Sequence, residues 1–314
     1  MRFARLSFLL LVPLLFGTTC RLDGPQAVKY KTKHVVVIVV DGARYSETWG
    51  DSTHANIPFR SGLLYREGVM LSHFSNDGNT WTNAGHDAIC TGFYEPLDNG
   101  GNQLPQYPSF FQYWRKATHK PMEKAWVITS KDKLFVLANC RDSAWQSQYT
   151  PAYDCGNNGP FSGYRDDSVT CQKVLSTFAA YQPDLMLVNF REPDYSGHTG
   201  NWNNYIAGIA STDHYIAEIW NYLQNDPYYK GSTTLIVTND HGRHSPGVLD
   251  GFPSHGDACP GCRHIEFIAA GPDFKQGETI DYDYGQVDIP CTIAALMGFE
   301  MPTGAGRIMH PLFR

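Results

Sequence analysis

The chain has 314 residues, of which 42% are hydrophobic and 18% are charged, and its formal net charge is −6. This composition excludes an intrinsically disordered chain, because it supplies enough apolar surface to bury a large core. The sequence holds no run of lysine and arginine, and its balance is acidic. It therefore lacks the electrostatic pattern of a nucleic-acid-binding surface, and no nucleic acid is expected as a structural partner.

Residues 1–20 have the pattern of an export signal. Two arginines near the start precede the apolar run "LSFLLLVPLLF", which is followed by "GTTC". The run is shorter than the roughly 20 residues that a membrane-spanning helix needs, which favours cleavage over a single-pass anchor. The stretch that ends at Cys20 resembles a bacterial lipoprotein processing site, so lipid attachment at Cys20 and ordinary cleavage nearby both remain open. We expect an exported protein, either periplasmic or anchored to a membrane surface by lipidation.

Segments typical of strands and of helices alternate along the rest of the chain. Five continuous apolar runs suit strands that are buried on both faces, at 34–42, 124–130, 185–190, 233–242 and 265–272. Helical patterns lie between and after them, at 57–68, 83–90, 108–118, 168–182, 202–224 and 286–298. This alternation predicts an α/β fold with a mostly parallel central sheet and helices on both faces. The irregular residues 140–167 are expected to form a long loop or a small lid.

Seven cysteines follow Cys20, and an exported protein is expected to use cysteines in disulfides. An odd number leaves at least one thiol free. Cys90 and Cys291 lie in apolar helical patterns and are expected to be buried thiols. The motif "CPGC" at 259–262 is also half of a zinc knuckle, but no second cysteine pair follows it. The candidates for disulfides are Cys140, Cys155, Cys171, Cys259 and Cys262.

Carboxylates follow three of the predicted strands. Asp41 ends the first strand in "VVDG", Asp194 follows the third in "PDYSGHTG", and Asp240 ends the fourth in "NDHG". Each motif taken alone is also ordinary turn chemistry. Ligands of open α/β sheets bind beyond the carboxyl ends of the strands, so the three acids are expected to lie together. Crowded carboxylates repel one another unless cations neutralise them, so their coincidence predicts a metal site.

Histidines accompany these acids. His198 and His241 lie in the same motifs, and His255 and His264 follow shortly afterwards. Carboxylates and imidazoles are ligands that zinc accepts, and the set is too large for one tetrahedral ion. Two Zn²⁺ ions would use all of these ligands and would suit the attacking and leaving oxygens of a phosphoryl group. The sequence therefore predicts a two-zinc centre whose substrate is a phosphate ester.

A nucleophile for such a centre is offered by "NTWTNAGHDAICTG" at 79–92. Thr82 opens the helical pattern, where free N–H groups and the helix dipole favour an anion such as a phosphate or an alkoxide. A nearby cation would lower the pKa of its hydroxyl. Thr82 as a plain helix cap is the simpler interpretation of this residue alone. Thr80 is the lesser candidate.

The chain resembles the alkaline phosphatase superfamily, and within it the branch of type I phosphodiesterases, nucleotide pyrophosphatases and threonine-dependent phosphatases. The resemblance rests on the order of "VVVIVVDG", "TNAGHDAICTG", "PDYSGHTG", "NDHG" and "VDIPCTIAALMG", which span nearly the whole mature chain. It implies that residues 28–314 form one alkaline phosphatase-like catalytic domain. The cysteine- or serine-based signature of sulfatases is absent from the sequence, which makes sulfate ester cleavage a less favoured activity.

The resemblance also implies roles for particular residues. Asp41, Asp240 and His241 would hold one zinc, with the Thr82 oxygen beside it. Asp194, His198 and His255 would hold the other zinc, and His264 is the alternative to His255. Asn102 in "GGN" resembles the asparagine that, with the backbone N–H of the nucleophile, holds a phosphoryl oxygen in this family.

The implied activity is hydrolysis of a phosphoric ester through a phospho-threonine intermediate, and the matched motifs favour a diesterase. Trp81, Phe93 and Tyr94 are candidates for the apolar slot that a diester needs. A monoesterase instead needs extra cations, for which Lys131, Lys133, Arg141 and Arg165 are available. Phosphonate hydrolysis or phosphomutase chemistry on the same scaffold is a further alternative. A non-catalytic zinc-binding surface lipoprotein is the alternative from another class.

Overall fold

The computed structural model describes Cys20 and residues 29–314. Its strands are β1 (His34–Val40), β2 (Gly68–Ser75), β3 (Ala125–Thr129), β4 (Ala152–Cys155), β5 (Leu185–Phe190), β6 (Thr233–Thr238), β7 (Phe267–Ala270) and β8 (Glu278–Gly285). Its α-helices are α1 (Tyr65–Glu67), α2 (Thr82–Thr91), α3 (Phe110–Thr118), α4 (Asp167–Tyr181), α5 (Asp194–His198), α6 (Trp202–Asn225), α7 (Pro260–Arg263) and α8 (Asp288–Met297). Helical segments of other types are η1 (Tyr45–Glu47), η2 (Arg60–Leu64), η3 (Met122–Lys124), η4 (Asp132–Ala138) and η5 (His310–Leu312).

The strands form a single eight-stranded sheet in the order β4-β3-β5-β1-β6-β7-β2-β8. Strand β1 lies in its centre and pairs in parallel with β5 on one side and β6 on the other. Only β7 runs against its neighbours β6 and β2. The predicted α/β fold with a mostly parallel sheet is therefore confirmed, and the central position of β1 brings the carboxyl ends of β5, β1 and β6 side by side.

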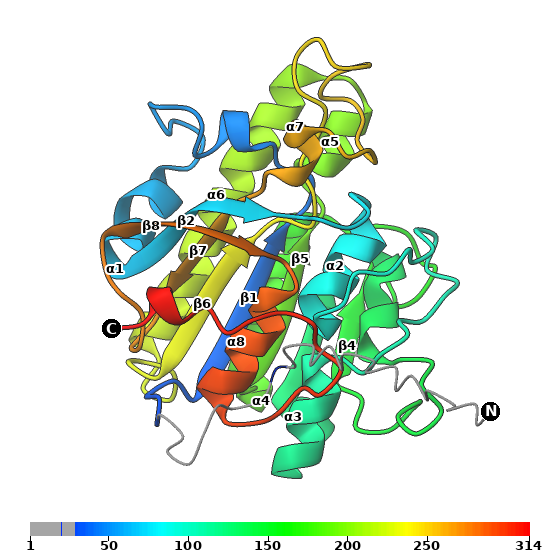
Figure 1. Cartoon of the computed structure of the whole chain (residues 1–314), viewed down its shortest axis with the longest axis vertical. Helices are drawn as coiled ribbons and strands as arrows, with labels where there is room; N and C mark the ends of the chain where they lie inside the picture. Colours follow the sequence, from blue (N-terminus) through cyan, green and yellow to red (C-terminus); the bar gives the residue numbers. More distant parts are fainter. Residues whose placement is uncertain (1–19, 21–28) are drawn as a thin grey trace, which may run out of the picture.

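Helices cover both faces of this sheet (Figure 1). All seven residues of β1 are buried, and successive side chains point to opposite faces. Val35, Val37 and Val39 belong to the core cluster that includes residues of α2, α3 and α8. Val36, Ile38 and Val40 pack instead with residues of α4 and α6. A strand enclosed in this way needs apolar side chains on both faces, which explains the continuous "HVVVIVV" run.

The five predicted strands correspond to β1, β3, β5, β6 and β7. The prediction missed three others. Strand β8 is an edge strand in which most side chains are exposed, so its sequence "ETIDYDYG" carries no apolar run. Strand β4 is a four-residue edge strand inside the region that was expected to be a loop. In strand β2 the first four residues are buried, but of the last four only Phe74 is.

Arginines order the irregular region around β4. Arg165 pairs with Asp154 and donates to the backbone oxygen of Thr129 at 3.1 Å. Arg141 pairs with Glu95 at 2.6 Å. Two of the four cations considered for phosphate recognition are thus engaged in holding the fold together.

The cysteine predictions need correction. The structure joins Cys20 to Cys291 of α8 in a disulfide, so Cys291 is not a free thiol, and the Cys20 sulfur cannot carry a lipid while this bond exists. The expected disulfides at the other positions do not form within the described chain: six cysteines there are free, Cys90, Cys140, Cys155, Cys171, Cys259 and Cys262. The remainder of the predicted signal, residues 1–19, lies outside the described residues. Among those described, no helix combines the length and the apolar character needed to cross a membrane.

Candidate active site

Three carboxylates meet at the carboxyl edge of the sheet. Asp41 follows β1, Asp194 opens α5 after β5, and Asp240 lies two residues beyond β6; all three are buried. The Asp240 side chain accepts a hydrogen bond from the N–H of Gly42 at 3.1 Å, and the N–H of Asp194 donates to the Asp41 carbonyl at 3.1 Å. The structure therefore brings together the three acids that the sequence placed at separate strand ends.

The first group of possible metal ligands is Asp41, Asp240 and His241, whose donor atoms all lie within 4.8 Å of one another. His241 donates from Nδ1 to the Gly242 carbonyl at 2.8 Å, which leaves Nε2 free to face the acids. Among the described residues, Nε2 of His241 and Oδ2 of Asp240 have no hydrogen-bond partner although both atoms are buried. Buried polar atoms without partners are costly, and a cation between them would satisfy both.

The second group surrounds Asp194. Oδ1 of Asp194 lies 3.3 Å from Nε2 of His198 and 3.4 Å from Nε2 of His255, and the two histidine nitrogens are 3.2 Å apart. The Nδ1 atom of His255 lies 2.8 Å from the Thr80 carbonyl, which directs Nε2 toward the acid. Burial, followed by the proximity of His241, lowers the pKa of His255 to about 2. Its neutral ring keeps a lone pair that a cation can use.

His255 also links the two groups, because its ring stacks on the ring of His241 with 3.8 Å between centroids. The alternative ligand, His264, lies elsewhere. Its Nε2 is 3.1 Å from the Ser72 carbonyl and its ring stacks on Tyr45. The structure thus brings His255 and not His264 to the three acids.

Lys131, which follows β3, lies between the two groups. Its ammonium is 2.6 Å from Oδ2 of Asp194, 2.9 Å from Oδ1 of Asp41 and 3.1 Å from Oγ1 of Thr82. Arg243 forms a second ion pair with Asp194. Burial opposes ionisation of Asp194, but these two cations outweigh it and hold the pKa of that carboxyl well below its usual range.

Asp41 lies in an environment that opposes its ionisation. Burial, followed by repulsion from Asp240, raises the pKa of Asp41 well above its ordinary value. Divalent cations in the two ligand groups would offset both effects. The donor set therefore fits the metals that the sequence predicted.

Thr82 is the first residue of α2 and is buried beside Lys131. The position of this helix depends on Gly85, because a Cβ atom there would lie 2.3 Å from the Asp240 carbonyl oxygen. Asn76 and Gln286 hold the same carbonyl oxygen with hydrogen bonds of 2.7 Å and 2.6 Å. The start of α2 is therefore packed directly against the segment that carries Asp240 and His241. Thr80 donates its hydroxyl to the Asp257 carbonyl at 2.8 Å and has a structural contact instead.

A cavity of about 390 Å³ opens in front of Thr82. Asn99 lines it and accepts hydrogen bonds from the N–H of Asn83 at 3.0 Å and from the ammonium of Lys133 at 3.1 Å. The predicted Asn102 is exposed, lies outside this cavity and donates to Asp98. The structure therefore brings Asn99, and not the expected Asn102, to the cavity. Both residues occur in "NGGN" at 99–102. The cavity is lined by Thr82, Asn99, Lys131, Lys133, Tyr164, Asp194, Tyr195, His198, Thr199 and His255.

The aromatic residues considered for a diester slot do not line this cavity. Trp81 is partly exposed, Phe93 packs on Tyr107, and the Tyr94 ring lies over Gly78. Two cations, Lys131 and Lys133, line it together with the aromatic side chains of Tyr164 and Tyr195.

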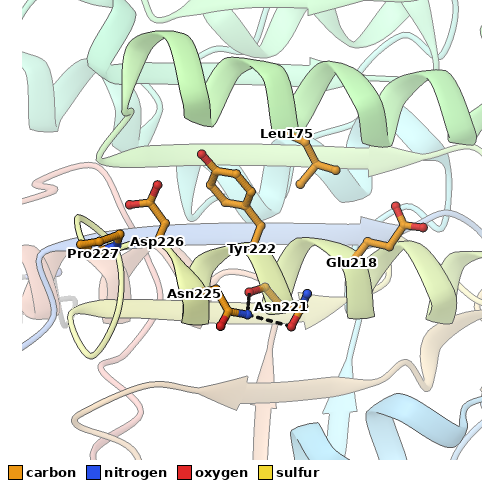
Figure 2. A pocket seen from close by; sticks show the side chains of 7 residues that line it. All are labelled: Leu175, Glu218, Asn221, Tyr222, Asn225, Asp226 and Pro227. Atoms are coloured by element: carbon orange, nitrogen blue, oxygen red, sulfur yellow. Dashed lines mark hydrogen bonds between the residues drawn. The ribbon is translucent and has the colours of Figure 1, made fainter.

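Another cavity, of about 550 Å³, lies between α4 and α6 (Figure 2). Its lining includes the acids Glu218 and Asp226 but no lysine or arginine, and Asn225 is hydrogen-bonded to Asn221. Since it offers no positive group and no nucleophile with an activating partner, it is unsuited to a phosphate ester.

The sheet order and the acid, imidazole and threonine groups at its carboxyl edge define an alkaline phosphatase-like protein. Residues 35–245 match the model of the type I phosphodiesterase / nucleotide pyrophosphatase family, and the chain belongs to that family. The resemblance stated from the sequence is thereby confirmed. Its scaffold is one used by phosphodiesterase and pyrophosphatase hydrolases, and the superfamily is metal-dependent.

Solved structures share the fold at low sequence identity. Murine ectonucleotide pyrophosphatase/phosphodiesterase 5 matches with a TM-score of 0.63 and 17% identity, covering 85% of this chain and 96% of that one. An inactive threonine-to-alanine variant of the same murine protein has been solved in complex with AMP. An alkaline phosphatase superfamily protein from Vibrio parahaemolyticus matches with a TM-score of 0.65 and 15% identity, covering 91% of this chain and 71% of that one.

Curated relatives match over a shorter stretch. The 2,3-bisphosphoglycerate-independent phosphoglycerate mutase of Caenorhabditis elegans is 26% identical over 130 residues, which are 41% of this chain and 23% of the mutase. The mutase of Gluconobacter oxydans is 28% identical over 134 residues, 41% of this chain and 24% of the mutase. The matches span about a quarter of the length of these relatives.

Proposed function

We propose that this protein is an exported phosphoric ester hydrolase that binds two divalent cations, most suitably Zn²⁺, and prefers phosphate monoesters. One observation carries the preference: Lys131 and Lys133 both line the cavity in front of Thr82. A monoester carries one more negative charge than a diester at neutral pH, and two buried ammonium groups favour that charge. This choice departs from the diesterase that the sequence motifs favoured.

In the proposed site, Asp41, Asp240 and His241 hold one cation, and Asp194, His198 and His255 hold the other. When bound, these cations lower the pKa of the Thr82 hydroxyl and neutralise phosphoryl oxygens. Neutralisation of Asp41 and Asp194 in this way leaves the Lys131 ammonium available to the substrate. Lys131 already lies 3.1 Å from Oγ1 of Thr82, so the same group can contact the nucleophile and a phosphoryl oxygen.

The proposed reaction has two displacements. As Oγ1 of Thr82 forms a bond to phosphorus, its hydroxyl proton passes to solvent, the ester P–O bond breaks, and the departing oxygen takes a proton from solvent. A water molecule then attacks the phosphorus of the phospho-threonine and the P–Oγ1 bond breaks. Inorganic phosphate is released, and one proton of that water restores the Thr82 hydroxyl. Asn99 contributes by fixing the N–H of Asn83 and the Lys133 ammonium at the same oxygen. The murine protein with the same fold is inactive when one of its threonines is replaced by alanine, which is the behaviour proposed here for Thr82.

The mature protein, loaded with zinc, should be assayed on an aryl phosphate monoester, a diester of the same aryl group and an aryl sulfate. We expect the highest kcat/KM for the monoester. Lys133→Ala should lower it for the monoester by about 10²–10³-fold, the usual cost of removing one preorganised donor, and affect the diester much less. A higher kcat/KM for the diester, with equal losses on both substrates in the variant, would contradict the monoester preference.

Phosphomutase activity is the second candidate, because the curated relatives that match are phosphoglycerate mutases. A mutase returns the phosphoryl group to another hydroxyl of the same substrate, whereas a hydrolase releases it. Measurement of free phosphate against consumed ester separates the two, and we expect one phosphate released per ester consumed.

Export is supported by the signal-like sequence that ends at Cys20 and by the disulfide between Cys20 and Cys291, since such bonds persist in oxidising compartments. The mature protein keeps this disulfide when cleavage falls before Cys20. A lipid on the Cys20 sulfur and this disulfide exclude each other. Mass spectrometry of the purified protein, with and without reductant, separates the periplasmic form from the lipid-anchored form.

A further inference from the structure

A second cluster of metal-binding side chains lies outside the site described above. His244, Asp257, Cys259 and Cys262 each offer one donor atom, and these four atoms lie within 4.8 Å of one another. His244 and Cys262 are buried, Cys259 is partly buried and Asp257 is exposed. None of the four belongs to the two ligand groups beside Thr82.

The His244 ring is oriented for a cation. Its Nδ1 lies 2.9 Å from Oδ1 of Asp250, so this carboxylate fixes the ring and leaves Nε2 deprotonated when the ring is neutral. Nε2 is buried, lacks a hydrogen-bond partner within the part of the chain that the structure describes, and lies 3.5 Å from Oδ1 of Asp257. A buried imidazole nitrogen held in this way against an acid and two thiols has the arrangement of a metal ligand.

The two cysteines are placed by the short turn of α7. The N–H groups of Cys262 and Arg263 both donate to the Cys259 carbonyl at 3.1 Å, which closes the "CPGC" turn. A Cβ atom at Gly261 would lie 2.4 Å from the Arg243 carbonyl oxygen. Only glycine permits this close contact, and the contact packs the turn against the backbone that carries His244.

We propose that His244, Asp257, Cys259 and Cys262 form a third metal site, a structural zinc site. Two thiolates, one imidazole and one carboxylate give four ligands of the types that zinc binds tetrahedrally with no open position. The thiol groups distinguish it from the Asp/His ligands beside Thr82, because soft sulfur ligands select zinc over magnesium, calcium or manganese. Binding converts both thiols to thiolates and releases their two protons to solvent.

The position of the site indicates what it does. His244 stands at the start of a long loop, Cys259 and Cys262 stand at its end, and His255 lies between them. His255 contacts the Thr80 carbonyl at 2.8 Å, and the Thr80 hydroxyl donates to the Asp257 carbonyl at 2.8 Å. A zinc ion that joins the two ends of this loop therefore holds His255 in place. This last role rests on the proposed function, whereas the metal site does not.

The direct test is to replace the bound metal of the purified mature protein with cobalt while the thiols of Cys259 and Cys262 are kept reduced. Cobalt bound to thiolates gives an intense sulfur-to-metal charge-transfer absorption, which oxygen and nitrogen ligands do not give. We expect this band in the wild-type protein, together with three equivalents of zinc per chain after zinc loading. The double variant Cys259→Ser, Cys262→Ser should lose the band and one equivalent of zinc.

Matched controls separate this site from the catalytic one. Cys171→Ser removes a buried cysteine whose thiol lies 3.5 Å from Glu218, and it should keep both the band and all the zinc. Asp240→Asn should lose zinc but keep the thiolate band. If the protein proves inactive toward every ester, the band still decides the existence of the structural site.

Two outcomes overturn the proposal. One is a wild-type protein that shows no thiolate-to-cobalt band, a measurement that needs no variant to fold. The other is a disulfide between Cys259 and Cys262, found by mass spectrometry in protein isolated with its full zinc content, because the sulfur atoms would then be unavailable to a metal.

Discussion

The sharpest test of the charge arrangement is Lys131→Met, which removes the ammonium but keeps an apolar side chain of similar length. The Lys131 ammonium is buried and lies 2.6 Å from Asp194 and 2.9 Å from Asp41. In metal-free protein the substitution leaves two buried carboxylates without this partner, which typically costs about 3–5 kcal/mol. An unfolding entropy of about 2.1 cal/mol/K per residue gives about 0.6 kcal/mol/K for a domain of this size, so we expect the melting temperature to fall by roughly 5–8 °C in the presence of a chelator.

Zinc should largely reverse this loss, because bound cations neutralise the same carboxylates. The remaining cost should be about 1 kcal/mol, that of a volume-conserving core substitution. In the wild-type protein Lys131 competes with cations for Asp41 and Asp194, so the rise in melting temperature on adding zinc should be larger in the variant. The assay is a pair of thermal melts of each protein, one with chelator and one with zinc.

Lys120→Met is the matched control. Its ammonium also lies 2.6 Å from a carboxylate, that of Asp184, but the lysine side chain is 45% exposed. The lysine end of this pair is open to solvent, and the buried Asp184 keeps Nδ1 of His34 at 3.0 Å. The loss should therefore be about 1 kcal/mol and equal with and without zinc. If Lys131→Met also destabilises the protein equally in both conditions, Lys131 does not share its carboxylates with metal ions, and the reasoning fails.

Three other changes test separate parts of the site. Thr82→Ala should retain the full metal content by elemental analysis but lose turnover by at least about 10³-fold, whereas a variant with wild-type turnover would exclude this nucleophile. Burial, followed by repulsion from Lys131, lowers the pKa of Lys133 to about 8, so its charge is present below this pH and is lost as the pH rises through it. KM for a monoester should therefore rise above pH 8, and Lys133→Arg should remove this rise; identical profiles of KM against pH would refute it. Gly85→Ala places a Cβ atom 2.3 Å from the Asp240 carbonyl oxygen and should lower both zinc affinity and stability, by about 1–3 kcal/mol for the latter, in calorimetry and melts. Unchanged zinc affinity there would show that α2 moves without disturbing the ligands.

Much of the fold could be predicted because the central strands are buried on both faces. A strand such as β1 favours apolar side chains throughout, so a short continuous run of apolar residues indicates its position. The edge strand β8 has exposed side chains and pairs through its backbone, which any sequence provides. Sequence patterns therefore located β1, β3, β5, β6 and β7. They missed β4 and β8, which lie at the edges of the sheet and have no continuous apolar run.

The candidate site could likewise be predicted only in part. Asp41, Asp194 and Asp240 were recognisable in the sequence, because each lies at the end of an apolar strand, and parallel strands end at the same edge of a sheet. The structure was needed to show which residues of the connecting loops approach those acids. It places His255 rather than His264 beside them, Asn99 rather than Asn102 at the cavity, and Lys131 and Lys133 in its lining. It also placed His244 against Cys259 and Cys262. The positions of loops depend on packing between segments that are distant in the chain, and a local pattern of residues does not predict that packing.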